Sequence, residues 1–208
     1  MGQQGQEEEA IIEVAREVAG KLGVSKFDLK RVLWVGRGQS DECQFFGRNL
    51  NAVVLPKALM GSLRPEEWRP LIASSLIRSR TGGNLVRRAA LRRLVLPSLL
   101  VGLVLVAIAV SFAKEQWTLF VIEAAGAVST VVLALLFAPE AKKAALTIDR
   151  RAAEVVGRES FLQVLQKIDG MGLKDVERLK AGGIRGRFKP SITERIDNLQ
   201  QTAGTAPP

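Results

Sequence analysis

The sequence contains no histidine and a single cysteine, Cys43. Zinc hydrolases hold their metal mainly through neutral imidazoles or thiolates, and they leave one position open for the water that the metal activates. A chain with this composition cannot build such a site alone, so we expect no metal site and no cofactor. A lone cysteine also excludes a disulfide within the chain and is compatible with a reducing compartment.

Aromatic residues are scarce too, since the chain has no tyrosine and 3 tryptophans. This scarcity argues against a stacking platform for single-stranded nucleic acid. Lysine and arginine total 30 against 21 acidic residues, which gives a formal net charge of +9. Such a balance favours an anionic partner, either nucleic acid or a membrane surface. The N-terminal stretch is polar and acidic, so we expect no secretory signal peptide.

Two long apolar runs lie in the middle of the chain, at residues 94–113 and 118–138. The first carries no charge and the second carries only Glu123. At about 1.5 Å per residue, each run is long enough to span the roughly 30 Å hydrocarbon core of a bilayer. Because only the short polar stretch 114–117 separates them, they predict a tight transmembrane helical hairpin. A buried hairpin in a soluble protein is the alternative, but uninterrupted runs of this length exceed ordinary core helices.

Basic residues lie just before the first run and just after the second. In a hairpin these two positions are at the same end, and so on the same side of the membrane. By the positive-inside rule they place both termini in the cytoplasm, in a multi-pass protein of the plasma (inner) membrane. Their position beside the membrane favours contacts with anionic lipid headgroups, so no nucleic-acid partner is expected. The candidate lipid-binding residues are Arg87, Arg88, Arg92, Arg93, Lys142 and Lys143.

Glu123 lies inside the second run, where a carboxylate is costly and usually faces protein or water. Small residues follow it, including Gly126. Together they predict a face that docks a membrane helix of a partner subunit, because small residues allow close approach and a polar group adds a directional contact. Two simpler interpretations are open. Glu123 is protonated or reaches out to the interface, or it contacts Ser111 or Lys114 within the hairpin.

The polar arms on either side of the hairpin predict a mostly helical α+β domain. Apolar residues at helical spacing indicate helices over 7–22 and 142–168. Further helices are expected after Pro65, over 173–180, and after Ser191, which forms a capping box with Glu194. Three short strands are expected at 31–35, 43–46 and 52–55.

The chain therefore divides into four segments. Residues 1–93 form the N-terminal half of the cytoplasmic domain and residues 139–200 form its helical C-terminal half. The hairpin, 94–138, separates the two halves, and residues 201–208 form a disordered tail.

The order of these features carries a resemblance to a known family. LRPEEWRPLIASSLIRSR (63–80) occupies the place of a zinc-binding helix, and it follows FFGRNLNAVVLPKALMGSL (45–63), which resembles an edge strand and a short helix. ALTID (145–149) and RFKPSITERIDNL (187–199) come after the two apolar runs. In this order the sequence resembles the HtpX-like membrane zinc metallopeptidases, the family that also contains the CAAX prenyl proteases. The resemblance implies a metallopeptidase-like cytoplasmic domain interrupted by a transmembrane hairpin.

The residues that would carry the family's chemistry are replaced. Within the family's HExxH signature, Ser74 stands at the first ligand histidine, Ser75 at the general-base glutamate and Arg78 at the second ligand histidine. Ala145 stands at the ligand glutamate of the E-x-x-A-D pattern. The family's Thr-His-Pro is replaced by Phe188, Lys189 and Pro190, whereas Asp149, Arg195 and Ile196 are retained and are expected to serve the scaffold.

The replacing residues have alternative interpretations. Ser74 and Ser75 could act as nucleophiles only with a base in reach, and no histidine exists to serve, so we interpret them as small residues that fill a lost site. Arg78 either binds a phosphate or carboxylate in the old cleft or, as we expect, pairs with Asp149 or a nearby glutamate in place of the metal. Cys43 follows two acidic residues that would raise its thiol pKa, so we expect it to be inert.

These features predict a catalytically inactive, metallopeptidase-like integral membrane protein, not an enzyme. Its expected role is that of an accessory or scaffold subunit in a complex with other membrane protein subunits. One alternative is a regulatory pseudoprotease that binds substrates or an active paralogue without cleavage. Another is a hydrolase with remodelled, non-zinc chemistry.

Overall fold

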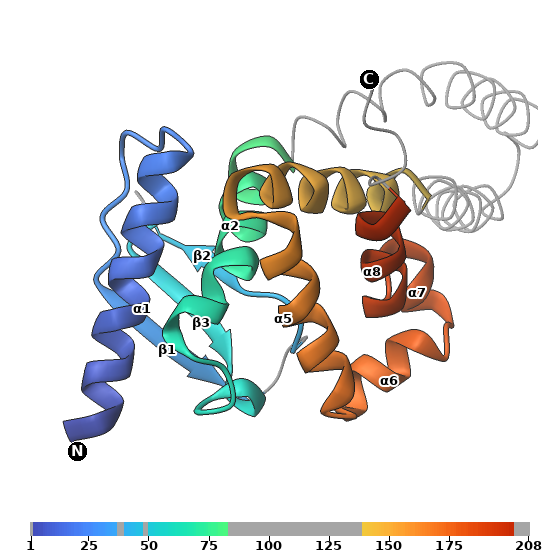
Figure 1. The fold of residues 1–208 in the computed structure, drawn as a ribbon, viewed down its shortest axis with the longest axis horizontal. Coiled ribbons are helices and arrows are strands. Elements are labelled where there is room, and N and C mark those ends of the chain that lie inside the picture. Colours follow the sequence, from blue (N-terminus) through green and yellow to red (C-terminus); the bar gives the residue numbers. More distant parts are fainter. Residues whose placement is uncertain (1, 37–39, 48–49, 83–138, 202–208) are drawn as a thin grey trace, which may run out of the picture.

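The computed structural model describes residues 2–36, 40–47, 50–82 and 139–201. It is mostly helical, with one small three-stranded sheet (Figure 1). The strands are β1 (Arg31–Val35), β2 (Gln44–Phe46) and β3 (Ala52–Pro56), in the order β1-β3-β2. β1 runs parallel to β3, and β2 runs antiparallel to β3. All three strands lie within a residue of their predicted bounds.

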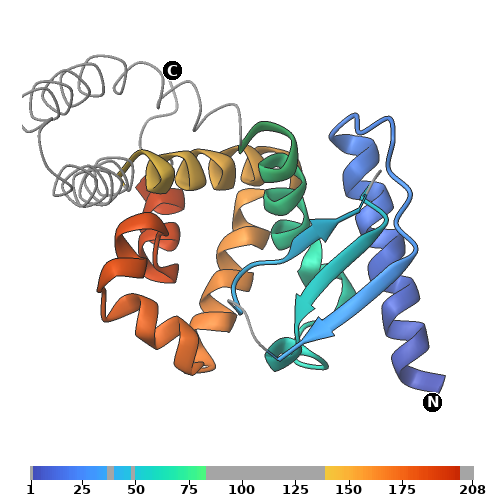
Figure 2. The ribbon, with the colours of Figure 1, turned by 180° about the vertical axis from the view of Figure 1, so that it is seen from behind.

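Helix α1 (Gly2–Lys21) packs along one face of this sheet (Figures 1 and 2). One stripe of the helix is buried because its apolar residues recur every three or four positions: Ile11, Val14, Ala15, Val18 and Ala19. The helix begins at Gly2, earlier than the predicted residue 7. The prediction missed this first part because its residues are polar and show no apolar periodicity. Gly23, with a φ of +63°, ends it, and the Val24 amide donates to the Ala19 carbonyl at 2.9 Å.

Helix α2 (Arg69–Ile77) is the centre of the fold, and its side chains are buried on nearly every side. The predicted start at Pro65 is instead a 3₁₀ turn, η2 (Pro65–Trp68). Pro70 has no backbone N–H, which suits only the first turn of an α-helix, so the regular helix starts just before it. A π-helical turn, η3 (Arg78–Gly82), follows α2 directly. Another 3₁₀ turn, η1 (Lys57–Leu59), follows β3.

The C-terminal arm is helical over 139–156 and then forms α5 (Arg158–Gly170), α6 (Lys174–Lys180), α7 (Ile184–Phe188) and α8 (Ile192–Gln201). The prediction of one helix over 142–168 is wrong, because Gly157 has a φ of +89° and separates two helices. Gln201, predicted to open a disordered tail, belongs to α8, and the rest of the predicted tail, 202–208, lies outside the described residues.

The capping box at the start of α8 is confirmed. The Ser191 amide donates to Glu194 Oε2 at 2.8 Å, and the Glu194 amide donates to Ser191 Oγ at 3.3 Å.

A single hydrophobic core joins the two arms of the chain. α2 contacts α1 on one side and α5 on the other. Trp68, Phe161 and Leu165 are fully buried in the same cluster, although they come from opposite ends of the sequence. Figure 1 shows α2 between the sheet with α1 and the C-terminal helices. The described parts of the halves 1–93 and 139–200 therefore share one core.

The predicted transmembrane hairpin has to be corrected. Within the described ranges no helix is both long and apolar enough to cross a membrane. α1 has 20 residues, but charged side chains recur along it, and α5 has 13 residues, too few for the roughly 30 Å of hydrocarbon. The described residues form a mostly helical α+β domain, and no transmembrane hairpin is found among them. The described residues likewise do not support the predicted membrane-protein class or the predicted multi-pass plasma-membrane location with cytoplasmic termini.

Several predicted residues fall on parts of the chain that the structure does not describe. The two apolar runs, 94–113 and 118–138, lie there. So do the predicted lipid-binding and partner-binding residues of that stretch: Arg87, Arg88, Arg92, Arg93, Glu123 and Gly126.

Candidate functional site

Ser74 and Asp149 meet in the buried centre of the molecule. Ser74 lies on α2 and Asp149 on the helical segment 139–156. The Ser74 hydroxyl donates to Asp149 Oδ1 at 2.8 Å. Both residues are shielded from solvent, with exposures of 3% and 0%. Of the positions that the sequence marked as degenerate, Ser74 is the one placed directly against the retained aspartate.

Arg195 of α8 completes this contact. Its Nε donates to Asp149 Oδ2 at 2.7 Å and its Nη2 to Asp149 Oδ1 at 3.0 Å, a two-point pairing of guanidinium and carboxylate. Its Nη1 donates to Asp41 Oδ2 at 2.9 Å and to the Asp41 carbonyl at 2.8 Å. The Phe161 ring lies 5.7 Å from the guanidinium carbon. Arg195 is 2% exposed, so these contacts replace its hydration.

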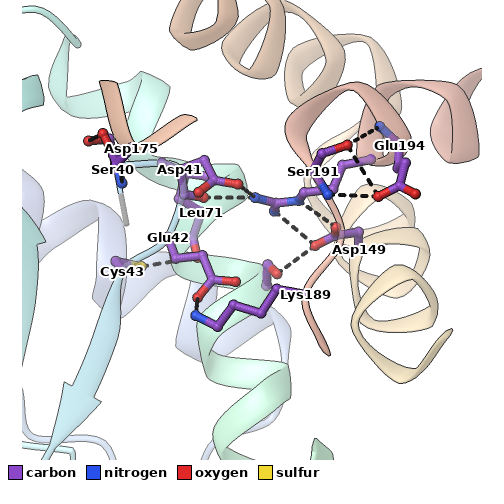
Figure 3. A network of polar contacts seen from close by, with 12 residues as sticks. Ser40, Asp41, Glu42, Cys43, Leu71, Asp149, Asp175, Lys189, Ser191 and Glu194 are labelled. Carbon is purple, nitrogen blue, oxygen red and sulfur yellow. Dashed lines mark hydrogen bonds and ion pairs between the residues drawn. The ribbon is translucent and has the colours of Figure 1, made fainter. Parts of the chain in front are cut away.

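A second ion pair lies beside the first. Glu42 Oε1 lies 2.7 Å from Arg78 Nη1, and Glu42 Oε2 lies 3.1 Å from Lys189 Nζ. Arg78 thus pairs with a nearby glutamate, one of the two partners expected for it, and not with Asp149. Figure 3 shows these side chains close together: Asp41 and Glu42 come from the segment before β2, Asp149 from the helical segment 139–156, and Lys189 from between α7 and α8. We call Asp41, Glu42, Ser74, Arg78, Asp149, Lys189 and Arg195 the ion-pair network.

The electrostatics of the network follow from burial and pairing. Burial would raise the pKa of Glu42, but Arg78 and Lys189 outweigh it and lower that pKa to about 2. Burial likewise opposes the charge on Arg195, yet Asp149 and Asp41 raise the pKa of this guanidinium above its usual value. Burial raises the pKa of Asp41, and Arg195 offsets only part of that effect. Within the described part of the chain, Asp41 Oδ1 has no hydrogen-bond partner.

The nucleophiles near the network are poorly placed for chemistry. Burial raises the pKa of the Cys43 thiol to about 12, and its Sγ donates to the Leu71 carbonyl at 3.1 Å. Ser74 donates to Asp149, and Arg195 pairs with both oxygens of that carboxylate, so the serine hydroxyl is tied to an ion pair. Ser75 is 8% exposed and lies near Cys43. This arrangement suits a structural cross-link better than covalent catalysis.

The donor set does not fit the zinc ion that the resemblance would place here. A hydroxyl and a guanidinium stand at the two histidine positions, and Ala145, one turn before Asp149, has no donor atom. Both oxygens of Glu42 face cations, and a divalent ion beside Arg78 and Arg195 would be repelled.

The two predicted lipid-binding residues that the structure describes, Lys142 and Lys143, both lie near acidic partners. Lys142 forms an ion pair with Glu194 and donates to the Gly186 carbonyl at 3.2 Å. Lys143 is more exposed and lies 3.7 Å from Glu140. These contacts give Lys142 a structural role next to the network, on the capping box of α8.

Three members of the network were missed or undervalued by sequence reasoning. Asp41 and Glu42 were considered only as neighbours of Cys43, and Lys189 only as a replacement for histidine. The signal that could have found them is the pair of adjacent acidic residues just before a predicted strand. If such a pair is buried, it requires cationic partners. Arg195 and Lys189 lie 154 and 147 residues away from their partners Asp41 and Glu42, so no local pattern indicates the pairing.

Comparisons of the chain with protein-family models, with curated proteins and with solved structures found no match.

Proposed function

We propose that this protein is a non-catalytic relative of the zinc metallopeptidases that acts as an accessory or scaffold subunit of a protein assembly. The observation that carries this proposal is the ion-pair network. Ser74 and Arg78, which stand at the family's histidine positions, both belong to it. The retained Asp149 and Arg195 form its centre.

The network supports a role without chemistry because it replaces what a metal would do for the fold. It joins α2, the helical segment 139–156, α8 and the residues before β2 through charged contacts. Breaking a buried ion pair by removing one partner costs about 3–5 kcal/mol, so such contacts hold elements in a fixed arrangement. A domain cross-linked in this way, with no cluster of metal ligands among the residues that the structure describes, is suited to present a surface to partners.

The zinc content of two proteins tests the loss of the metal site. We expect the wild-type chain to purify without stoichiometric zinc and to cleave no peptide. The variant S74H/S75E/R78H/A145E restores the family's ligands and base, and we expect it to take up about one zinc per chain. The matched control is S74H/S75E/A145E, which keeps Arg78 and therefore lacks the second histidine ligand. One tightly bound zinc in the wild-type chain, or wild-type peptidase activity lost in S75A, contradicts the proposal.

The accessory role needs a separate test. The tagged full-length chain is expressed from its native locus, cross-linked in cells and purified. We expect a discrete assembly, larger than the chain itself, that contains the same partner proteins in every preparation. Recovery of the chain alone under these conditions contradicts the scaffold role and leaves the zinc result unaffected.

A further inference from the structure

A cavity of about 230 Å³ lies between α6 and the ends of β1 and β3. β1 and β3 are parallel, so their carboxyl ends, Val35 and Pro56, meet at the same edge of the sheet. Ligands of parallel sheets bind preferentially outside the carboxyl ends of the strands. The cavity is separate from the ion-pair network, and the proposed scaffold role does not use it.

Two cations on one face of α6 line this cavity. Lys174 and Arg178 are one helical turn apart, and both are exposed. Among the described residues neither has a hydrogen bond or an ion pair. Lys180, on the same helix but outside the cavity, pairs with Asp169 at 2.6 Å and with Glu177 at 2.8 Å. The cations that face the cavity are therefore available to a ligand.

The acidic residue of the cavity is already satisfied. Asp175 Oδ2 accepts the Ser40 amide at 2.6 Å, and Asp175 Oδ1 accepts the Ser40 hydroxyl at 3.0 Å (Figure 3). Both carboxylate oxygens are thus engaged by Ser40 rather than by Lys174 or Arg178. The same contacts fix α6 against the segment that follows β1, so the two cations are held near the sheet before any ligand arrives.

We propose that this cavity binds a small organic anion, with one carboxylate or phosphate group and a short apolar body. The guanidinium of Arg178 presents a planar pair of donors that matches either group, and Lys174 adds a point charge. Val35, Pro56 and Ala58 supply apolar wall for the rest of the ligand. The volume is below the roughly 300–1,000 Å³ of sites for drug-sized ligands, so the occupant is small.

Titration of the purified full-length chain with three probes tests this site. The probes are phenyl phosphate, benzoate and inorganic phosphate, at about 0.15 M salt so that distant charges are screened. We expect saturable binding of phenyl phosphate or benzoate, measured by calorimetry, and weaker binding of inorganic phosphate, which lacks the apolar body. Whichever of phenyl phosphate and benzoate binds more tightly identifies whether the natural ligand carries a phosphate or a carboxylate. If no probe binds with a dissociation constant below about 10 mM, the proposal is overturned. This limit corresponds to roughly 3 kcal/mol of binding free energy at the 1 M standard state.

Three variants separate a built site from general attraction of anions to a basic protein. R178Q removes the fork of donors, and we expect about tenfold weaker binding. A58L fills the cavity without changing charge, at an exposed position where folding tolerates it, and we expect a similar loss. R16Q removes one exposed charge from α1, far from the cavity lining, and should leave binding unchanged. Equal losses in R178Q and R16Q, or full binding by A58L, overturn the proposal.

Discussion

Ser74 and Asp149 lie 75 residues apart in the sequence, and a hydrogen bond of 2.8 Å joins their side chains. The contact connects α2 to the helical segment 139–156, so it links the two arms of the chain inside their common core. Ser74 also stands where the resemblance places a metal ligand, and Asp149 is a residue that the resemblance retains. The contribution of this hydrogen bond to stability can be measured without knowing the function of the protein.

Replacing Ser74 with Ala should lower the free energy of unfolding by about 1–2 kcal/mol. A hydrogen bond to a charged group contributes about 1.5–3 kcal/mol. The lower end applies because Arg195 still satisfies both oxygens of Asp149. Urea denaturation of the full-length chain gives the value. Ser75→Ala is the matched control on the same helix, and it should cost less than half as much. If the two variants lose the same free energy of unfolding, the hydrogen bond from Ser74 to Asp149 adds no measurable stability beyond that of a buried serine.

Replacing Arg195 with Met should be far more severe, with a loss of about 3–5 kcal/mol. The substitution leaves Asp149 and Asp41 buried, at exposures of 0% and 1%, without their cation. Thermal unfolding should show the midpoint falling by roughly 10 °C for a chain of this size. The triple variant D41L/R195M/D149L removes the charges together and should be more stable than R195M alone. If the triple variant is less stable, the uncompensated charges are not the cause of the loss.

Much of the fold could be predicted from local patterns in the sequence. The strands, α1 and the Ser191–Glu194 capping box depend on neighbouring residues, which periodicity and capping rules describe directly. β2 pairs antiparallel with β3, which is the next strand along the chain. The parallel pairing of β1 with β3 has no local signature, because the two strands are not consecutive in the sequence.

The site was predicted only in part, for the same physical reason. The resemblance directed attention to Ser74, Arg78, Asp149 and Arg195, and the structure brings all four into the network. Asp41 carried no such cue, since its contact with Arg195 spans 154 residues. The helix break at Gly157 was missed because apolar residues keep helical spacing on both sides of it. A glycine inside such a pattern is compatible with either a continuous helix or a break.

The pH dependence of stability should reveal the Glu42 pair. The pKa of Glu42 is lowered from an ordinary value of 4.5 to about 2, so its ionisation favours the folded state. The contribution, at most roughly 3 kcal/mol, is fully present above about pH 5 and is lost as the pH falls toward 2. Asp41 has a raised pKa, so its ionisation disfavours the folded state and opposes the effect of Glu42. The quantity to compare is therefore the difference in the free energy of unfolding between wild type and E42Q.

Urea denaturation between pH 7 and pH 3 measures that difference. We expect it to fall by about half or more over this range as the unfolded chain takes up a proton at residue 42. The exposed Glu66 provides the control E66Q, which removes a glutamate outside the ion-pair network. A difference between wild type and E42Q that stays constant with pH would mean that Glu42 is not stabilised as an anion.

Gly157 provides a test of the backbone alone. Its φ of +89° and ψ of 127° lie where a residue with a Cβ is strained, and a Cβ built there meets nothing within 4 Å. Any loss in Gly157→Ala therefore reports conformational strain, expected at about 1–3 kcal/mol, rather than a steric clash. Gly20→Ala is the matched control, because Gly20 lies within α1 and its Cβ site is equally open. There alanine should stabilise the chain by roughly 0.5–1 kcal/mol. Urea denaturation of the two variants should thus give effects of opposite sign, and stabilisation by both would indicate one continuous helix through residue 157.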